Sequence, residues 1–148
     1  MSSINKTYYV DIKYHEGITP IEQTRRGDMI DLRCAEHDLV LKKGDYYEIS
    51  LGISVRLPNG CRMQLYPRSS TYKKYGIIMV SSGVIDESYC GDGDIIKFGV
   101  LALRDTVIPF DERICQCEIL EKMPRTKFKI VEKLSNNNRG GFGSTGYK

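Results

Sequence analysis

The chain has 148 residues, with 22 Lys and Arg against 19 Asp and Glu, and a formal net charge of +3. This length fits one domain able to bury a core without disulfides or a structural metal, and the slight charge excludes the basic stripe of proteins that bind nucleic acid directly. No apolar run approaches the ~20 residues of a membrane helix, and residues 1–6 lack the apolar core of a signal peptide, so we expect a cytoplasmic protein without membrane contact.

Alternation of apolar and polar residues with period two runs through most of the chain and predicts strands. In chain order, the expected strands are 8–14, 39–41, 46–57, 61–66, 77–80, 95–103, 113–120 and 128–131. One short helix is expected at residues 70–75, ended by Gly76 at its C-cap. Many short strands separated by turn signals predict an all-β fold of the sandwich or barrel type.

The cysteines form an odd set of five without a Cys-x-x-Cys pair, which argues against a disulfide framework and against a zinc site. Cys115 and Cys117 lie two positions apart. On a strand both side chains would face the same side, so we expect them to be small buried hydrophobic residues.

A candidate base lies in residues 82–91, which we interpret as a hairpin. Its apolar residues Val84 and Ile85 deliver Asp86 to the tip, and Tyr89 follows. A carboxylate at such a tip can act as a general base for water if it points into a pocket. The alternative is an ordinary turn aspartate that accepts hydrogen bonds from its own backbone, and a single Asp favours that alternative.

A candidate anion site follows the expected strand 61–66, where Arg68, Ser69 and Ser70 come after Pro67. An arginine and two hydroxyls at one point suit a phosphate oxygen, although a helix cap with a solvent-facing arginine is the commoner case. Asp31 alternates with apolar neighbours and suits either a cation or a lysine.

The segment 139–146 combines Arg139, four glycines, the hydroxyls of Ser144 and Thr145, and the ring of Phe142. Glycines let backbone N–H groups approach an anion, arginine offers a planar charged fork, and the ring can stack on a base. The alternative is a mobile Gly-rich tail. Both interpretations hold if the tail is mobile when free and closes over a bound nucleoside triphosphate.

These elements follow one another in a definite order along the chain. They are Asp31-Leu32, Pro67-Arg68-Ser69, Gly83-Val84-Ile85-Asp86 with Tyr89 and Gly91, Arg113-Ile114-Cys115-Gln116, and residues 139–146. From about residue 27 to its end, the chain resembles the trimeric deoxyuridine triphosphatase (dUTPase) family, in forms from Gram-positive bacteria and their phages. The resemblance implies a homotrimer of distorted jelly-roll-like, β-clip barrels, with a barrel domain at 1–134 and a flexible, phosphate-binding C-terminal arm at 135–148.

The family resemblance also implies an activity. Members of the family are dUTP diphosphatases that hydrolyse dUTP to dUMP and pyrophosphate by attack of water on the α-phosphate, which limits uracil incorporation into DNA and supplies dUMP for thymidylate synthesis. Asp86 matches the carboxylate that activates this water. The expected cofactor is Mg²⁺ on the triphosphate, and Asp31 matches the carboxylate that contacts it indirectly, through metal-bound water.

The resemblance further implies which residues bind the substrate. Backbone groups around Val80, Gly83, Val84 and Ile85 would recognise uracil, and the ring of Tyr89 would lie under the deoxyribose and exclude a 2′-hydroxyl. The residues that match phosphate and tail contacts are Arg68, Ser69, Ser70, Gln116, Arg139, Gly141, Phe142, Gly143, Ser144 and Thr145.

The chain departs from the family pattern at a few positions. Ser70 stands where many members have glycine, and Asp111 begins Asp111-Glu112-Arg113 in place of Gly-Asp-Arg, which questions the geometry of the fourth motif. Cys115 replaces alanine and would make the site sensitive to thiol reagents if it were exposed.

Two alternatives remain open at this point. A dCTP deaminase of the same fold would need a glutamate near the amino group of the base, and the Asp86 motif favours the hydrolase instead. Resemblance to phage forms also leaves room for a regulatory protein partner whose binding depends on nucleotide occupancy.

Overall fold

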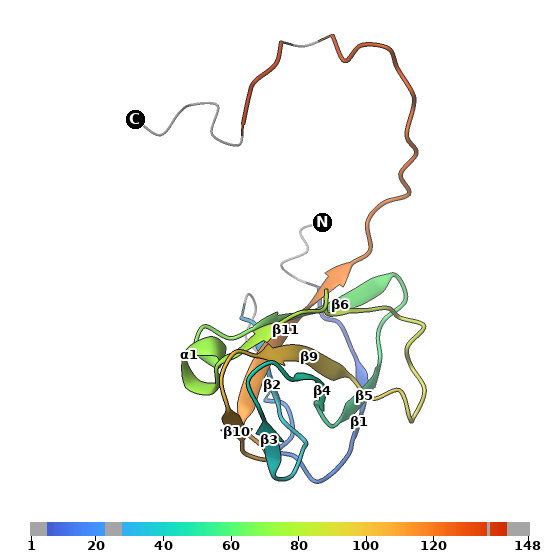
Figure 1. The fold of residues 1–148 in the computed structure, drawn as a ribbon. Helices are drawn as coiled ribbons and strands as arrows, with labels where there is room; N and C mark the ends of the chain where they lie inside the picture. Colours follow the sequence, from blue (N-terminus) through green and yellow to red (C-terminus); the bar gives the residue numbers. More distant parts are fainter. Residues whose placement is uncertain (1–5, 23–27, 136, 142–148) are drawn as a thin grey trace.

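The computed structural model describes residues 6–22, 28–135 and 137–141, and within them the chain is all-β with one short helix (Figure 1). The expected fold class is therefore confirmed. The elements are β1 (Asp11–Tyr14), β2 (Ile30–Arg33), β3 (Leu39–Leu41), β4 (Tyr46–Ser50), β5 (Ile53–Arg56), β6 (Cys61–Pro67), α1 (Thr71–Tyr75), β7 (Ile77–Met79), β8 (Val84–Ile85), β9 (Lys97–Ala102), β10 (Thr106–Ile108) and β11 (Arg113–Glu121).

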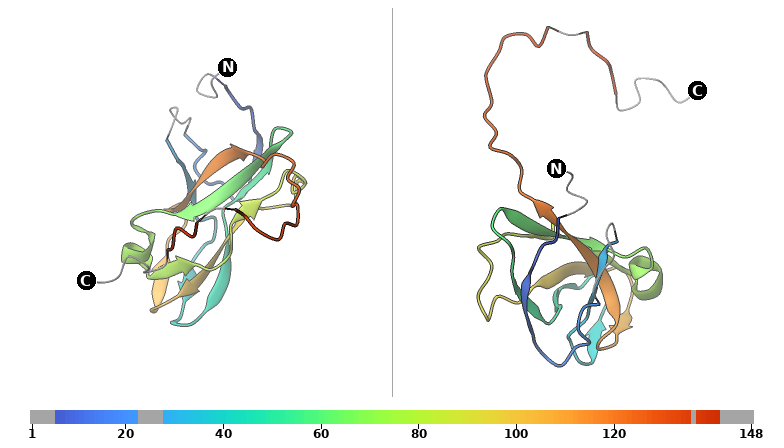
Figure 2. Two further views of the ribbon diagram at one scale, coloured as in Figure 1. Left: turned by 90° about the horizontal axis from the view of Figure 1, so that it is seen from above. Right: turned by 180° about the vertical axis from the view of Figure 1, so that it is seen from behind.

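The strands form four small antiparallel sheets that enclose one core. The largest has the order β2-β11-β6-β8, the next β4-β9-β7, and two pairs, β1-β5 and β10-β3, complete the body. Figure 2 shows these sheets wrapped around a common interior. Many strand partners are far apart in sequence. For example, β11 pairs with both β2 and β6. Long-range pairing of this kind brings residues of several motifs onto one sheet.

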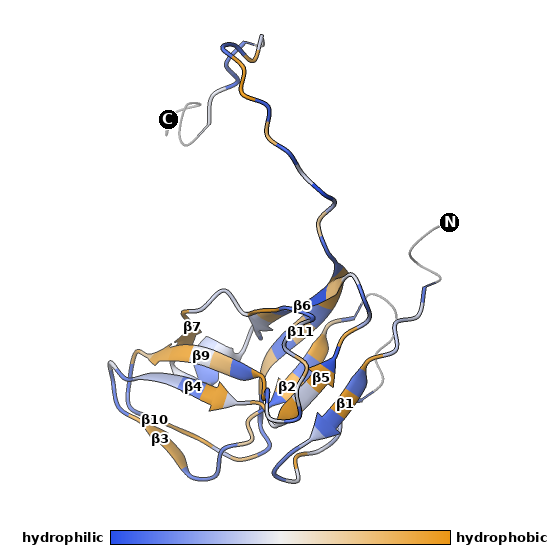
Figure 3. Cartoon of the chain, turned by 90° about the vertical axis from the view of Figure 1, so that its right-hand side faces the viewer, coloured by the Kyte–Doolittle hydropathy of each residue, from blue (hydrophilic) through white to orange (hydrophobic). Residues whose placement is uncertain are grey.

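Burial alternates along β6, and along β11 from Cys115 to Glu118, which explains why the period of two in the sequence predicted these strands. On β6 the buried residues alternate with half-buried ones, as they do in a strand with one face on the core. Orange and blue segments alternate along the same strands in Figure 3. Cys115 and Cys117 are fully buried on β11, as expected, and burial raises the pKa of the Cys117 thiol to about 12. Cys115 is thus closed to thiol reagents.

The expected strand 46–57 is wrong in one respect, because it is two strands in different sheets. β4 joins β9, whereas β5 joins β1, and the chain bends at Leu51 and Gly52 between them. Leu51 N–H donates to the carbonyl of Ile96, and Ile96 N–H donates to the carbonyl of Ile53. Backbone hydrogen bonds to Ile96 therefore hold the bend in place. Because Leu51 and Ile53 are both buried, apolar alternation continues through the bend and conceals it.

The expected strand 128–131 is also wrong for the single chain. Residues beyond Glu121 leave the body as an extended segment (Figures 1 and 2), and Phe128 and Ile130 are 95% and 97% exposed. An extended segment becomes a strand only when another strand satisfies its backbone groups, and no described strand of this chain lies beside it. The boundary expected at residue 134 stays a prediction.

Among the described residues, no helix has the length and apolar character needed to cross a membrane.

Candidate functional site

The residues of the first, second and fourth motifs meet where β2, β11 and β6 lie side by side. On β11, Gln116 is paired with Asp31 of β2 and with Tyr66 of β6. Arg68 follows directly after β6, so its side chain reaches the same place. The sheet register therefore brings Asp31, Arg68 and Gln116 together, although they are spread over more than half of the chain.

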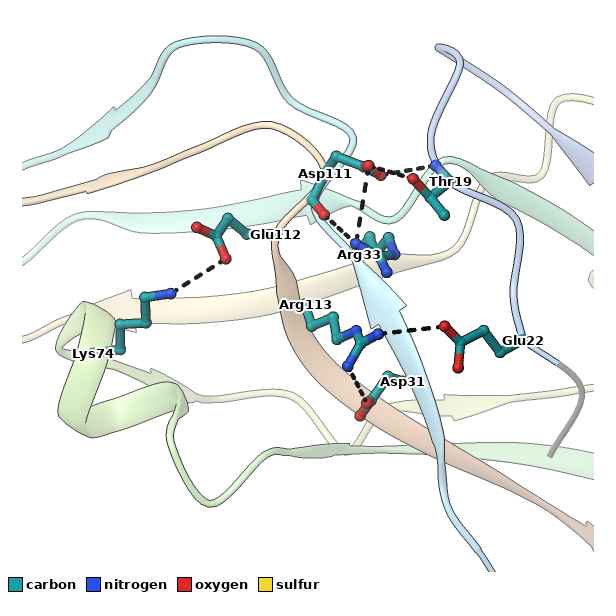
Figure 4. A network of polar contacts seen from close by, with 8 residues as sticks. All are labelled: Thr19, Glu22, Asp31, Arg33, Lys74, Asp111, Glu112 and Arg113. Carbon is teal, nitrogen blue, oxygen red and sulfur yellow. Dashed lines mark hydrogen bonds and ion pairs between the residues drawn. The ribbon is translucent and has the colours of Figure 1, made fainter. Parts of the chain in front are cut away.

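Asp31 is the carboxylate around which two arginines gather. Arg68 Nε lies 3.1 Å from Asp31 Oδ1, and Arg113 Nη1 lies 3.9 Å from Asp31 Oδ2. Arg113 Nη2 also lies 3.5 Å from Glu22 Oε1 (Figure 4). Side chains of Asp31, Arg68 and Arg113 keep 30–40% of their surface exposed. Two guanidinium groups at one accessible point can bind an anion with several charges, such as a polyphosphate.

Thr71 holds the backbone of Arg68 in place. Its Oγ1 accepts a hydrogen bond from Arg68 N–H (2.9 Å) and donates one to the carbonyl of Ile114 (2.8 Å), and the side chain is buried. Gln116 Nε2 donates to the carbonyl of Pro67 (3.1 Å). Ser69 is exposed and Ser70 half-buried, and Ser70 makes no capping bond to α1 with its side chain. Both hydroxyls are thus accessible beside Arg68.

Asp111 adopts a left-handed backbone conformation, which glycine tolerates better than other residues. Its φ is +67°, in the left-handed region, and its carbonyl accepts from Arg33 Nη1 (2.7 Å). The carboxylate accepts from Thr19 N–H (2.8 Å) and Thr19 Oγ1 (2.5 Å), which lowers the pKa of Asp111 (Figure 4). The turn before Arg113 therefore forms with a left-handed aspartate, and the bonds of its carboxylate to Thr19 offset the strain.

We expect Asp111→Ala to lower the free energy of unfolding by about 2 kcal/mol, because alanine keeps the left-handed strain and loses both bonds to Thr19. Asp111→Gly should cost about half as much, since glycine removes the strain while losing the same bonds. Urea unfolding at one fixed protein concentration measures both. Equal losses for the two variants would show that backbone strain at Asp111 is not a factor.

Asp86 follows β8 in the loop 80–91, which we call the Asp86 loop. Asp86 Oδ2 accepts from Ser88 N–H (2.9 Å) and Ser88 Oγ (2.6 Å), and Lys122 Nζ lies 3.2 Å from Oδ1. These contacts, those with Ser88 foremost, lower the pKa of Asp86 to about 2. The carboxylate is thus ionised at neutral pH, and its side chain is 54% exposed to solvent.

The sequence pattern predicts an independent hairpin at residues 82–91. In the structure, the rest of the Asp86 loop is instead held against β6. Val84 and Ile85 pair with Gln64 and Met63 of β6, and the carbonyl of Gly83 accepts from Leu65 N–H (2.8 Å). Gly83 has φ +66°, and a Cβ there would lie 2.9 Å from the Leu65 Cβ. Only glycine lets the loop approach β6 this closely.

Tyr89 and Val80 flank the two ends of the Asp86 loop. The Tyr89 hydroxyl donates to the carbonyl of Ile95 (2.8 Å), and Tyr89 N–H donates to the carbonyl of Asp86 (3.0 Å). Val80 N–H donates to the carbonyl of Gly99 (3.0 Å), which joins the loop to β9. The side chains of Tyr89 and Val80 are 39% and 46% exposed, so a flat ring and an apolar group face solvent beside Asp86.

The two clusters lie at opposite ends of β6. Ile85, which precedes Asp86, pairs with Met63, whereas Arg68 follows five residues after Met63, which corresponds to about 17 Å along a strand. In Figure 1, α1 and the yellow segment before β9 lie on opposite sides of the body, as this register requires. One chain therefore does not bring Asp86 together with Asp31 and Arg68.

The expected tail residues are only partly described. Arg139 and Gly141 are exposed on the extended segment beyond β11. Phe142, Gly143, Ser144 and Thr145 lie outside the described residues.

The sequence interpretation missed three residues of this site. The motifs place Arg113 in the fourth motif without pairing it with Asp31, and they give no role in the site to Thr71 or Lys122. Arg113 alone carried a signal, since it lies three positions before Gln116 in the fourth motif. Contacts of Thr71 and Lys122 depend on strand pairing, which local patterns do not reveal.

Comparison with protein families places these residues in a known context. A family model described as dUTPase matches residues 18–146. The SPbeta prophage-derived deoxyuridine 5′-triphosphate nucleotidohydrolase YosS of Bacillus subtilis (strain 168) is 48% identical over 141 residues, covering 94% of this chain and 99% of the relative. The deoxyuridine 5′-triphosphate nucleotidohydrolase of Hydrogenobaculum sp. (strain Y04AAS1) is 36% identical over 134 residues, covering 87% of this chain and 90% of the relative.

Solved structures show the same fold. The dUTPase of Staphylococcus bacteriophage 80alpha with dUpNHpp has a TM-score of 0.74 at 20% identity, covering 95% of this chain and all of that chain. The dUTPase from Streptococcus mutans has a TM-score of 0.67 at 18% identity, covering 78% of this chain and 98% of that chain. At these identities the likeness establishes the fold.

Proposed function

Because this chain belongs to the dUTPase family and is a dUTP nucleotidohydrolase, we propose that Asp86 is the carboxylate that orients the attacking water. The observation that supports this role is the position of an ionised, accessible carboxylate at the end of β8, with Oδ2 occupied by Ser88. A carboxylate with a pKa near 2 is a weak base, so its main contribution is to hold and align water rather than to abstract a proton early. Most of the barrier reduction in phosphoryl transfer comes from positioning and charge neutralisation.

The cluster of Arg68, Ser69, Ser70 and Gln116 would bind the phosphates, with Arg68 neutralising charge and the other three donating hydrogen bonds. dUTPases typically use Mg²⁺, and the chemistry here fits an ion held mainly by phosphate oxygens and water. Among the described residues, no group of three or more His, Cys, Asp or Glu could hold a metal, and the nearby carboxylate of Asp31 suits a contact through water. Bound Mg²⁺ would neutralise charge on the triphosphate.

Selectivity for the nucleoside would come from the Asp86 loop. Backbone groups at Val80, Gly83, Val84 and Ile85 are candidates to recognise uracil, and the half-exposed ring of Tyr89 would exclude a 2′-hydroxyl. Tyr89 is anchored at its hydroxyl by Ile95, so the ring cannot easily move aside. Rigid backbone recognition favours one base because unmatched donors and acceptors are costly to bury.

We expect Gly83→Ala to raise the Kd for dUpNHpp at least about tenfold, because 1–2 kcal/mol of left-handed strain and a contact with Leu65 displace the loop. Gly93→Ala is the matched control, since a Cβ there meets nothing within 4 Å and φ is not left-handed. Isothermal titration calorimetry measures both. Wild-type affinity in Gly83→Ala would show that this loop does not bind the nucleoside.

We also propose a homotrimer in which the Asp86 loop of one subunit faces the Arg68 cluster of a neighbour. Two observations support it. The clusters are about 17 Å apart along β6 in one chain, and the segment beyond β11 leaves Phe128 and Ile130 almost fully exposed. Apolar residues exposed to this degree are typical of surfaces covered by a partner. Heterologous contacts of this kind close into a ring.

Mixed oligomers test this arrangement. Asp86→Asn and Arg68→Ala subunits should each be nearly inactive alone, whereas co-expression in equal amounts should restore about a quarter of wild-type sites, since each restored site takes one intact group from each subunit. Size-exclusion chromatography with light scattering gives the oligomeric state. Absence of any recovery in a mixed trimer would place both groups in one subunit.

The activity itself is tested by pyrophosphate release with Mg²⁺ from dUTP, dTTP, dCTP and UTP. Turnover of dUTP alone is the expected result. Comparable turnover of several nucleotides would contradict the role of the Asp86 loop in selectivity.

A regulatory protein partner remains a prediction. An affinity screen with immobilised protein, with and without dUpNHpp, would detect a partner whose binding depends on nucleotide occupancy. Equal recovery in both conditions would argue against a nucleotide switch.

A further inference from the structure

Lys122 comes directly after β11 and reaches back to the Asp86 loop. Its Nζ lies 3.2 Å from Asp86 Oδ1 and 2.6 Å from Glu87 Oε1. Its backbone N–H donates to the carbonyl of Gly60 (2.8 Å), and Glu87 Oε2 accepts from Gly60 N–H (3.0 Å). One lysine and one glutamate therefore tie together the loop, the turn between β5 and β6, and the end of β11.

These contacts fix both oxygens of the Asp86 carboxylate. Ser88 donates two hydrogen bonds to Oδ2, and Lys122 occupies one side of Oδ1. A carboxylate has about four acceptor sites, so three donors leave room for a water on Oδ1. Lys122 thus limits where such a water can bind.

The ion pair between Lys122 and Asp86 contributes little to the stability of the fold. The side chains of Lys122 and Asp86 are 37% and 54% exposed, and exposed ion pairs add little to stability because water and salt screen them. Orientation is the larger consequence, because a misplacement of about 1 Å can cost about 10²-fold in rate.

We propose that Lys122 is a positioning residue for dUTP hydrolysis, which holds Oδ1 of Asp86 so that the attacking water has one orientation. The inference rests on the role proposed for Asp86. Lys122 acts through that carboxylate and is anchored by Glu87, whose own bond to Gly60 holds it in place.

Within residues 6–22, 28–135 and 137–141, the charged groups that the contacts and the strand register place near Asp86 come from three elements. Lys122 comes from the end of β11, Glu87 from the same loop, and Arg62 from β6, one residue before the Met63 that pairs with Ile85. Ser88 has the largest effect on the pKa of Asp86, and Lys122 lowers it further. Removing the lysine should therefore raise that pKa, but the two bonds from Ser88 remain, so the carboxylate stays ionised at pH 7 and a loss of activity reports its orientation rather than its charge.

Three variants test the proposal, with kcat and KM for dUTP and the Kd for dUpNHpp measured at pH 7. Lys122→Met should lower kcat about tenfold and leave KM and Kd within about twofold. Lys122→Arg should recover most of kcat. Lys42→Met is the matched control, because Lys42 also pairs with a surface aspartate, Asp105 at 4.0 Å, but on the β3 side of the body.

Each result with these variants either supports or contradicts the positioning role of Lys122. Wild-type kcat in Lys122→Met would overturn the proposal, and a raised KM and Kd with unchanged kcat would make Lys122 a substrate ligand instead. An Asp86→Asn enzyme that still turns over dUTP would contradict the proposed role of Asp86, whatever Lys122 does. Loss of activity in Asp86→Asn together with normal Lys122→Met would reject only the positioning role.

Discussion

Replacing Asp86 by Asn is expected to lower kcat for dUTP by about 10²–10⁴-fold, the range that a positioned acid or base contributes. Asparagine has nearly the same shape and keeps an oxygen that can accept from Ser88 N–H, so the loop should retain its backbone. The amide cannot take a proton from water, and one of its two terminal groups is a donor. Pyrophosphate release in single-turnover and steady-state assays measures the loss.

Retained binding separates a chemical defect from a structural one. We expect Asp86→Asn to bind dUpNHpp within about threefold of wild type, since removal of a group that acts in the transition state leaves ground-state binding largely intact. A large loss of both binding and turnover would mean that Asp86 mainly holds the loop or the sugar. Unchanged turnover would exclude it as the group that orients the water.

Deletion of residues 139–148 is the second change with a large expected effect. We expect kcat/KM to fall about 10²–10⁴-fold, because an arginine on phosphate contributes about 1.5–3 kcal/mol and a ring stacked on a base about 1–3 kcal/mol. The fold should be unaffected, since Arg139–Gly141 are exposed and make no contribution to the core. Steady-state kinetics and circular dichroism measure the two effects.

Single substitutions show which part of the tail acts. Phe142→Ala should raise the Kd for dUpNHpp about tenfold, whereas Arg139→Lys should weaken phosphate binding by less than full deletion, because lysine keeps the charge and loses the bidentate fork. The truncated chain should keep the oligomeric state of the full chain in light scattering. Dissociation to monomers on truncation would mean that this tail serves assembly rather than the substrate.

Much of the fold could be predicted from local pattern. The expected strand 39–41 coincides with β3, and the expected helix 70–75 with α1, which ends at Gly76 in the left-handed conformation. β2 and β10 were not among the expected strands. The strand 128–131 was wrong for the single chain because alternation reports an amphipathic segment, and says nothing of whether a partner strand is present.

The departure at Asp111 shows what a motif alone leaves open. In sequence, aspartate in place of glycine questioned the turn before Arg113, because a side chain at positive φ is strained. In the structure, Thr19, which lies 92 positions away, supplies the two hydrogen bonds that hold this aspartate. No local pattern contains that compensation.

By itself, the sequence determined the family, the fold class and the chemical type of each candidate site residue, because strand periodicity and motif order depend on neighbours in the chain. Only the tertiary structure decided which of these residues meet. The register of β11 against β2 and β6 places Gln116 with Asp31, whereas the register of β8 against β6 places Asp86 at the far end. Register between distant strands depends on packing of the whole core, and it also brings Lys122 to Asp86.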